Sequence, residues 1–224
     1  MALAMRHRDD PGPVLAPVAG LVVQREDDAQ VMAALQDRSP VDIQARFDSG
    51  HRAYVALLNG ERAAWGWVAT TSAEIGELNS AFRLAPRERY LWNFVTVGAF
   101  RGRGIYPRLL TAIVDAELPD ADRFWIAYAP ENRASGSGIR RAGFRMLAEL
   151  SFDMEGRPSV RSLVEGGGHE AELVTGVPEV AEVLAACWKC TRAGKSAAAA
   201  CREGECCCDY QQPAVQCASP IDSL

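Results

Sequence analysis

The chain has 224 residues, of which 48% are hydrophobic and 24% charged, and its formal net charge at pH 7 is −5. This length accommodates one globular domain of roughly 150 residues with extensions. The acidic balance argues against a general nucleic-acid or anionic-membrane binder, and no apolar run reaches the ~18 residues of a membrane span. We therefore expect a cytoplasmic protein, with neither nucleic acid nor membrane as a partner.

The elements expected in chain order begin with a short strand at residues 21–24 and two helices at 26–36 and 39–50, the second with Pro40 in its first turn. Asn59-Gly60 lies between two apolar, aromatic-rich runs and predicts a hairpin over residues 52–71. The remaining expected elements are a strand at 89–97, a helix at 105–118, a strand at 123–129, a helix at 132–143 and a strand at 144–154. This order predicts an α/β domain with a mixed, largely antiparallel sheet flanked by helices.

The two ends of the chain differ from this middle part in composition. Residues 1–17 are predicted to be a loose N-terminal segment rather than a signal peptide. Three glycines at 166–168 indicate a linker, and residues 171–188 fit a short helix interrupted near Pro178. We therefore expect a domain at 18–160, a linker with a short helix at 161–185 and a low-complexity tail at 186–224.

The segment "GAFRGRG", residues 98–104, connects an expected strand to an expected helix. A loop that opens a helix directs free N–H groups and the positive end of the helix dipole toward one point, which suits an anion such as a pyrophosphate. Gly102 and Gly104 let an oxygen approach the backbone, and Arg101 and Arg103 add charge-assisted hydrogen bonds. The alternative interpretation is an ordinary helix start with solvated arginines.

Two motifs together are similar to those of a known family. "RGRGIY" resembles the Arg/Gln-x-x-Gly-x-Gly/Ala signature of the GNAT superfamily of acyl-CoA-dependent N-acyltransferases, and "APENRASGSGIRRAGF" resembles that family's second cofactor segment. The resemblance covers roughly residues 21–154. It implies a GNAT-like sheet whose central strands splay apart, and direct transfer of an acyl group from acetyl-CoA or another acyl-CoA to a primary amine of a small molecule or peptide.

The resemblance also implies which residues bind the donor. The cofactor-facing backbone would be Phe94, Val95, Thr96 and Val97, the pyrophosphate would be bound by Arg101, Gly102, Arg103, Gly104 and Ile105, and Asn132 would lie beside the pantetheine or thiol. No metal ligand is expected in the domain, and a homodimer is left open.

Two positions depart from the family pattern. Tyr106 stands where Gly or Ala is usual, and Ile139 stands where the family frequently has its general-acid Tyr. Because isoleucine has no proton to donate, either water protonates the leaving thiolate or another hydroxyl does so, with Tyr128 and Tyr106 as the candidates. Each tyrosine could equally be a packed side chain.

The candidates for a general base are carboxylates that precede or begin the cofactor strand. Glu77 is preferred and Glu88 is second, with Glu74 nearby, whereas no histidine is a strong candidate. Alternation along a strand predicts that Trp65 shares a face with Trp67, and Trp92 with Phe94. Core packing and an acceptor site both fit these aromatic side chains.

All seven cysteines lie at or after Cys187. Cys187 and Cys190 have the spacing of metal ligands, and Cys206 to Cys208 could complete a site, but the tail is equally a candidate for modification or an extension without a role in catalysis. A catalytically degenerate protein of this fold, which binds acyl-CoA or a partner and carries a metal-binding or modifiable tail, is therefore the alternative to an enzyme.

Overall fold

A computed structural model describes residues 1–184, except for the side chain of Glu77. Its strands are β1 (Ala2–His7), β2 (Leu21–Glu26), β3 (Arg52–Leu58), β4 (Glu61–Ala69), β5 (Ser72–Ile75), β6 (Ser80–Arg83), β7 (Glu88–Thr96), β8 (Arg123–Tyr128), β9 (Arg145–Phe152) and β10 (Pro158–Ser162). Its helices are α1 (Ala29–Gln36), α2 (Pro40–Asp48), α3 (Ile105–Glu117), α4 (Arg133–Arg141) and α5 (Gly167–Thr175), and short 3₁₀ turns cover Gly76–Leu78 and Gly98–Phe100.

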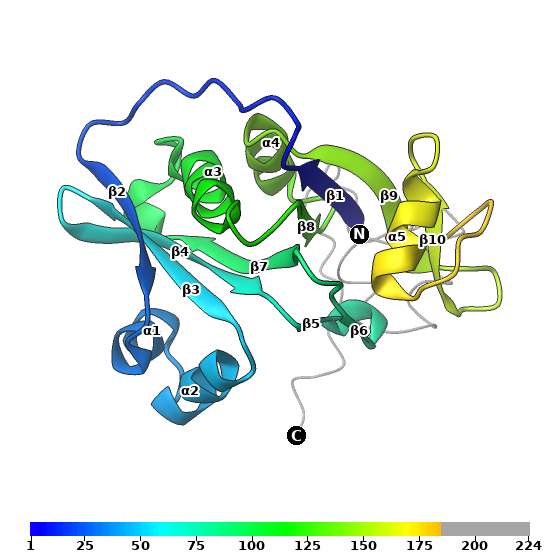
Figure 1. The fold of residues 1–224 in the computed structure, drawn as a ribbon, viewed down its shortest axis with the longest axis horizontal. Helices are drawn as coiled ribbons and strands as arrows, with labels where there is room; N and C mark the ends of the chain where they lie inside the picture. The colour runs from blue at the N-terminus through cyan, green and yellow to red at the C-terminus, as the bar shows by residue number, and fades with distance from the viewer. Residues whose placement is uncertain (185–224) are drawn as a thin grey trace, which may run out of the picture.

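The strands form an eight-stranded sheet in the order β10-β9-β1-β8-β7-β4-β3-β2, and β5 and β6 form a separate hairpin. Every named pair is antiparallel except β7 with β8. Helices α3 and α4 cover one face of the sheet, while α1, α2, α5 and the hairpin cover the other (Figure 1). The predicted mixed, largely antiparallel sheet flanked by helices is confirmed.

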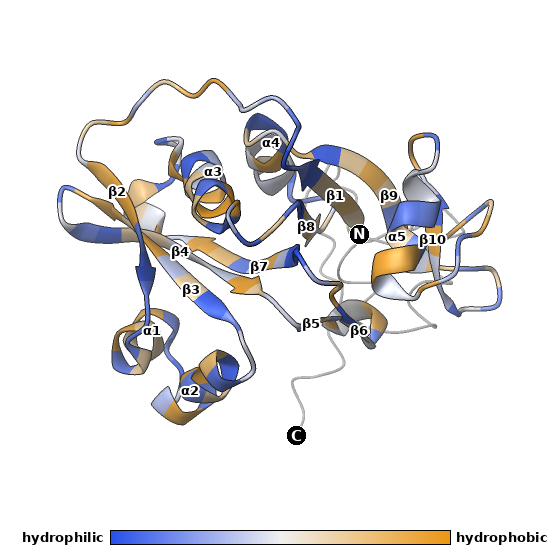
Figure 2. Cartoon of the chain, in the orientation of Figure 1, coloured by the Kyte–Doolittle hydropathy of each residue, from blue (hydrophilic) through white to orange (hydrophobic). Residues whose placement is uncertain are grey.

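The helices begin where local chemistry predicts. Asp28 caps α1 by accepting hydrogen bonds from the N–H groups of Gln30 and Val31, and Ser39 caps α2, which has Pro40 at its start. Helix α3 is amphipathic, as Figure 2 shows, and its apolar side packs Leu109, Leu110 and Ile113 fully buried against the sheet. Helix α3, which follows the "GAFRGRG" loop, and helix α4, which ends just before Gly143, lie at the predicted positions.

The prediction of a loose segment at residues 1–17 is wrong for residues 2–7. They form β1, which lies between β8 and β9, with Leu3 and Met5 in the core on one face and Ala4 in the core on the other. A strand buried on both faces has no alternation of polar and apolar residues, so the period-2 pattern that indicates a half-buried strand is missing here.

The predicted linker is also an ordered part of the domain. Strand β10 pairs with β9, and α5 begins within the glycine run. A Cβ on Gly167 would lie 2.4 Å from the carbonyl oxygen of Leu147, and one on Gly168 would lie 2.0 Å from the Glu179 carboxylate. These two glycines therefore serve close packing rather than flexibility. The domain continues past the predicted end at 160, because the buried Leu184 donates its N–H to the Phe152 carbonyl at 2.7 Å.

Strand β7 contains a β-bulge that changes which face its side chains occupy. Trp67 of β4 is opposite Trp92 and Trp65 is opposite Val95, so Asn93 and Phe94 together oppose Gly66, and Asn93 has a φ of +53°. Trp92 therefore packs toward α1 and α2, whereas Phe94 packs on the α3 face. The prediction that Trp92 and Phe94 share a face is wrong, because an extra residue shifts the alternation by one.

The same strand separates from its parallel neighbour just before the bulge. The β7–β8 register runs from Glu88 opposite Arg123 to Leu91 opposite Ile126 and ends there, although β7 continues to Thr96 and β8 to Tyr128. Beyond Leu91 the backbone of β7 no longer has β8 beside it. The predicted splay of the central strands is confirmed.

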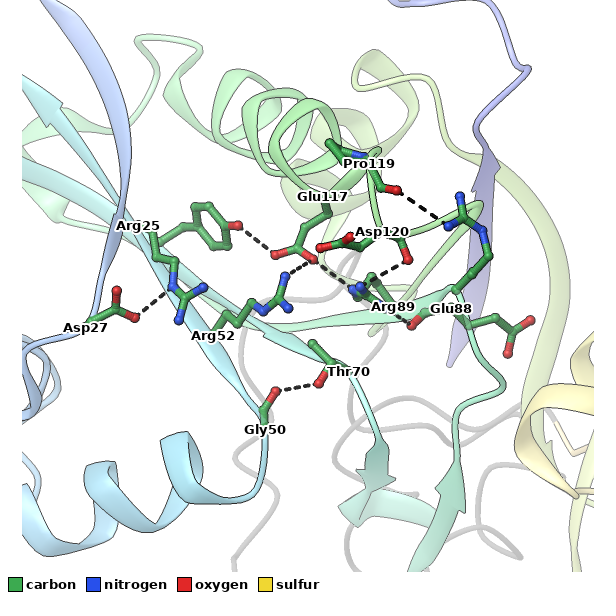
Figure 3. A network of polar contacts seen from close by, with 12 residues as sticks. Arg25, Asp27, Gly50, Arg52, Thr70, Glu88, Arg89, Glu117, Pro119 and Asp120 are labelled. Atoms are coloured by element: carbon green, nitrogen blue, oxygen red, sulfur yellow. Dashed lines mark hydrogen bonds and ion pairs between the residues drawn. The ribbon is translucent and has the colours of Figure 1, made fainter.

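A buried ionic network joins α3 to the sheet (Figure 3). Glu117 is fully buried at the end of α3 and accepts hydrogen bonds from Arg52 at 2.6 Å, Tyr54 at 2.7 Å and Arg89 at 2.8 Å. Burial would raise the pKa of Glu117, but the hydrogen bonds from Arg89, Arg52 and Tyr54 outweigh it and hold that pKa below its usual value. The network fixes the paired ends of β3 and β7 relative to α3.

Candidate functional site

A cleft of about 650 Å³ lies where β7, the "GAFRGRG" loop, the start of α3 and one side of α4 meet. We call it the α3/α4 cleft. Its lining includes Phe94, Val95, Thr96, Phe100, Arg101, Gly102, Gly104, Ile105, Tyr106, Pro107, Asn132, Ala134, Ser135, Ser137, Gly138 and Arg141. Of the ten residues that the resemblance implies for donor binding, eight line this cleft: Phe94, Val95, Thr96, Arg101, Gly102, Gly104, Ile105 and Asn132.

The loop at the mouth of the cleft has the backbone conformation that its glycines allow. Gly102 and Gly104 have φ values of +76° and +69°, and no heavy atom lies within 4 Å of a Cβ position at Gly102. Gly104 caps α3 without a side-chain hydrogen bond, so the first N–H groups of the helix have no side-chain acceptor in their own cap. This arrangement can bind an anion.

The arginines around the loop have different surroundings. Arg101 donates from Nε to the Thr96 carbonyl at 3.1 Å and lines the cleft. Arg103 instead lies with its guanidinium 5.5 Å from the centre of the Phe100 ring, and it is not among the lining residues. Arg108 binds the Gly104 carbonyl at 2.6 Å and also the Ala16 carbonyl, which connects the loop to the segment after β1. The cleft's charge thus comes from Arg101 and Arg141.

One face of α4 supplies the opposite wall of the cleft. Asn132 caps α4 by accepting the N–H of Ser135 at 3.0 Å, and the lining positions 134, 135, 137, 138 and 141 recur at helical spacing. Ser135, Ser137 and Arg141 were not predicted from the sequence. The helical period counted from Asn132 is the signal that would have found them.

Two hydroxyl groups meet inside the cleft. The Tyr106 and Ser135 oxygens lie 3.3 Å apart, and burial raises the pKa of Tyr106 to about 12, although the hydrogen bond with Ser135 opposes this shift. Tyr128 is not a lining residue; its ring packs against Gly136, where a Cβ would lie 2.6 Å from the ring. Ile139 is fully buried in the core. Of the hydroxyls considered from the sequence, Tyr106 is therefore the one that lines the cleft.

A second hollow, of about 410 Å³, lies on the other face of the sheet, beside the residues of β7 that precede the cleft. We call it the α2 pocket. It is lined by Asp42, Ala45, Arg46 and Ser49 of α2 and the following residue, by His51, by Ser72, Ala73, Glu74 and Ala81 of the hairpin, and by Tyr90 and Trp92. Tyr90 and Trp92 line this pocket on either side of Leu91, where the pairing of β7 with β8 ends, and residues 94–96, beyond that point, line the cleft.

The α2 pocket combines aromatic and charged groups. The Arg46 guanidinium lies 5.1 Å from the Trp67 ring centre and 4.9 Å from the Trp92 ring centre. Trp92 donates from Nε1 to Nδ1 of His51 at 3.1 Å. Burial and the nearby Arg46 charge lower the pKa of His51, with Glu74 opposing them, and so favour the neutral imidazole, whose Nδ1 accepts the Trp92 hydrogen bond. His51 thus offers its other ring nitrogen as a donor, a feature not predicted from the sequence.

The carboxylates proposed as bases have different positions. Glu74 is exposed and lines the α2 pocket. Glu77 lies in the 3₁₀ turn Gly76–Leu78, but its side chain is outside the described residues. Glu88 is buried at the paired end of β7, where it accepts the Ala85 N–H at 3.2 Å and lies 3.6 Å from Arg123, and it lines neither hollow.

Comparison with known proteins gives partial likeness to solved structures. No family model matches the chain, and no curated protein matches it either. A GCN5-related N-acetyltransferase from Kribbella flavida is 15% identical with a TM-score of 0.45, over 65% of this chain and 53% of that one. A putative GNAT acetyltransferase from Novosphingobium aromaticivorans is 20% identical with a TM-score of 0.44, over 65% and 59%.

A third structure, a Bacillus subtilis acetyltransferase in complex with CoA, is 17% identical with a TM-score of 0.43, over 59% of this chain and 81% of that one. The match thus spans little more than half the length of the first two structures. Because all three TM-scores lie below 0.5, the likeness does not by itself assign an activity to this chain.

Two further sequence predictions concern the membrane and the tail. Among the described residues, the helices are all too short or too polar to cross a bilayer. The predictions for the cysteine-rich segment 186–224, including its metal-binding and modification alternatives, lie outside the described residues.

Proposed function

We propose that this chain is an acyl-CoA-dependent N-acyltransferase of the GNAT superfamily. The observation that carries the proposal is the single cleft in which the separated, bulged part of β7 meets the two left-handed glycines that open α3. A strand that has no neighbouring strand on one side suits an amide-bearing arm, and a glycine loop at a helix start suits a pyrophosphate. The "RGRGIY" and "APENRASGSGIRRAGF" motifs both contribute to this cleft.

The residues of the cleft fit an acyl-CoA in chemistry as well as in arrangement. The N–H groups at Gly104 and Ile105 and the Arg101 guanidinium would hold the pyrophosphate, while the backbone at Phe94, Val95 and Thr96 would hold the pantetheine arm, with Asn132 at the opposite wall. When bound, the acyl-CoA supplies an activated acyl thioester. The chain's own residues hold it in place and manage the protons.

The α2 pocket is proposed to hold the acceptor amine. It lies on the other face of the sheet from the cleft, beside the point where the pairing of β7 with β8 ends. Transfer of the acyl group from sulfur to nitrogen requires that the amine lose a proton and that the sulfur gain one. Glu74 of the pocket, or Glu77 three residues further along the chain, is the proposed acceptor of the first proton, and the Tyr106 hydroxyl is the proposed source of the second.

The second candidate function is acyl-CoA binding without turnover. It is favoured by Ile139, which is fully buried and removes the hydroxyl that the family pattern would supply. The two candidates agree on donor binding and differ in release of free CoA when an amine is present.

The first prediction tests donor binding by calorimetry with acetyl-CoA. Replacing Gly104 by Val puts a Cβ 2.5 Å from Nη1 of Arg108 and is expected to weaken binding by about ten- to a hundredfold, as for one or two lost charge-assisted hydrogen bonds. Gly156→Val is the matched control, because Gly156 also has a positive φ, of +75°, but lies in the turn between β9 and β10. Arg101→Met removes the guanidinium proposed to bind the pyrophosphate without altering the backbone, and it is also expected to weaken acetyl-CoA binding.

Equal affinity of the Gly104, Arg101 and Gly156 variants would contradict the proposed donor site. Release of CoA is then measured over a panel of primary amines with the wild-type chain. Binding with release supports the transferase, whereas binding without release on any amine of the panel supports the second candidate.

A further inference from the structure

Gln36, the last residue of α1, gathers three hydrogen bonds on one side-chain oxygen. Its Oε1 accepts from Nη1 of Arg46 on α2, from Nε1 of Trp67 on β4 and from Nδ2 of Asn93 on β7, each at 3.2 Å. Its own amide donates to the Met32 carbonyl at 3.1 Å, which fixes the side chain against the helix. A half-buried residue of α1 therefore connects one helix and two strands.

Asn93 is the member of this set whose backbone is unusual. Its φ of +53° is in the left-handed region, where Asn is among the few tolerated residues besides Gly. It belongs to the bulge, in which Asn93 and Phe94 together oppose Gly66. The hydrogen bond from the Asn93 side chain to Gln36 therefore anchors the residue that makes the bulge.

The bulge decides how β7 presents itself to the cleft. Since it shifts the alternation by one residue, Phe94 and Thr96 face α3 and α4, and Val95 packs toward α1. The Phe94 ring lies over Gly66, where a Cβ would be 2.0 Å from the ring. Without the bulge, Phe94 would be on the face of Trp92, and the residues after it would also exchange faces.

We propose that Gln36 is a positioning residue, whose side-chain oxygen holds Asn93 in its left-handed conformation and thereby sets the bulge that presents residues 94–96 to the donor. The inference rests on the proposed function for the nature of the donor. It assigns a role in acyl-CoA binding to a residue on the far face of the sheet, which does not line the cleft. The same oxygen accepts a hydrogen bond from Arg46, which lines the α2 pocket, and one from Asn93, which precedes the cleft residue Phe94.

The second prediction tests this role by a rescue experiment on acetyl-CoA affinity. Gln36→Leu removes the acceptor oxygen and is expected to weaken acetyl-CoA binding by about tenfold, as for the loss of one hydrogen bond between the backbone at residues 94–96 and the donor. Gln36→Glu keeps an acceptor and is expected to bind nearly as the wild type. In the double variant Gln36→Leu/Asn93→Gly, affinity should return, because glycine adopts a positive φ without an anchor.

The matched control is Gln44→Leu, which removes an exposed glutamine that binds Asp48 within α2 at 2.9 Å and touches neither strand. It is expected to leave the affinity unchanged. Thermal unfolding of each variant accompanies the binding measurement. If Gln36→Leu loses affinity and Asn93→Gly does not restore it, or if Gln36→Leu binds as Gln44→Leu does, the proposal is overturned.

A second measurement separates this inference from the proposed function. Amide hydrogen exchange at residues 93–96, measured without ligand, reports the bulge directly. We expect faster exchange there in Gln36→Leu and wild-type rates in Gln36→Glu. If the wild type binds no acetyl-CoA, the proposed function fails, but this exchange pattern would still support the positioning role; unchanged exchange in Gln36→Leu would refute it.

Discussion

Tyr106 and Ser135 bring two hydroxyl groups into the cleft, whereas Ile139, at the position where the similar family frequently has an acid, is fully buried in the core. Tyr106 replaces a small residue of the loop signature, and Gly138 makes room for its ring, since a Cβ there would lie 2.4 Å from the ring. The two departures from the family pattern are thus near each other in space. The chain thus has a tyrosine hydroxyl at position 106 and lacks the one that the family pattern would place at position 139.

The third prediction concerns this hydroxyl. If Tyr106 protonates the leaving sulfur, Tyr106→Phe should lower kcat by a factor of about 10² or more, because general acid–base assistance is typically worth about 10²–10⁴. Acetyl-CoA affinity should change little, because the ring remains. Burial raises the Tyr106 pKa to about 12, so the hydroxyl should stay protonated and the rate should not fall through its ionisation below about pH 10.

Tyr128→Phe is the comparison for that experiment, because the Tyr128 ring packs against α4 outside the cleft lining. Steady-state rates of CoA release for the two variants, measured side by side, decide between the hydroxyls. A full rate in Tyr106→Phe with a large loss in Tyr128→Phe would return the role to the residue first predicted from the sequence.

Among the elements, α3 is fixed to the sheet by a buried carboxylate. The Glu117 side chain has no solvent exposure, and the Arg89 side chain that pairs with it is 7% exposed. Replacing Glu117 by Gln leaves Arg89 as a buried cation without its counter-charge. Removing one partner of a buried pair typically costs about 3–5 kcal/mol of unfolding free energy.

The fourth prediction is therefore a loss of about 3–5 kcal/mol in Glu117→Gln, measured by denaturant unfolding at pH 7. Because the folded-state pKa of Glu117 is lowered, its stabilisation is present above the unfolded pKa of about 4.3 and is lost as the pH falls below it. The wild type and the variant should therefore converge in stability on the acid side. Asp122→Asn is the control: Asp122 pairs with Arg87 and Arg8, but its side chain is 31% exposed and those of the arginines are 44% and 42% exposed, so water screens the pairs and the loss should be smaller.

How far the sequence predicts the elements depends on how each one is buried. Helices with caps and a single apolar side, such as α2 and α3, could be placed to within a few residues. Strand β1 could not, because both of its faces are buried and it lacks alternation. The phase of β7 after Trp92 could not be placed either, since the bulge depends on tertiary contacts of Asn93 that no local pattern encodes.

The candidate site shows the same division. The positions of the loop glycines and Asn132 at the cleft could be predicted, because they follow from local backbone chemistry and a motif. Arg103 and Glu88 were predicted from proximity in sequence, yet Arg103 stacks on Phe100 and Glu88 pairs with Arg123. His51 and Arg46 were missed because their environment is created by strands and helices that meet only in the folded molecule.

For the whole molecule, the predicted boundary near residue 160 is replaced by one at or beyond Leu184. Val174 of α5 and the later Val177 and Leu184 are 4–6% exposed. Burial of a Val or Leu side chain contributes about 1.5–3 kcal/mol. A chain cut at Gly166 loses all three of these contacts, whereas a chain cut after Leu184 keeps them.

The fifth prediction follows from that difference. Truncation after Leu184 should preserve the melting temperature and the acetyl-CoA affinity, and truncation at Gly166 should lower the melting temperature strongly or prevent folding. Scanning calorimetry of the two products checks this. An unchanged transition in the shorter product would show that α5 does not contribute to the core, and loss of acetyl-CoA binding by the longer one would assign the tail a part in the site.

Strand β1 has a consequence for the order in which this molecule assembles. Ala2 is in register with both Tyr128 and Glu149, so β1 cannot pair until most of the described chain has left the ribosome. Strands β2, β3 and β4, by contrast, are joined to neighbours close in sequence and can form early. Closing the long loop from β1 costs entropy that only the completed sheet returns. During synthesis, the apolar residues of β1 therefore have no neighbouring strand until β8 and β9 have been made.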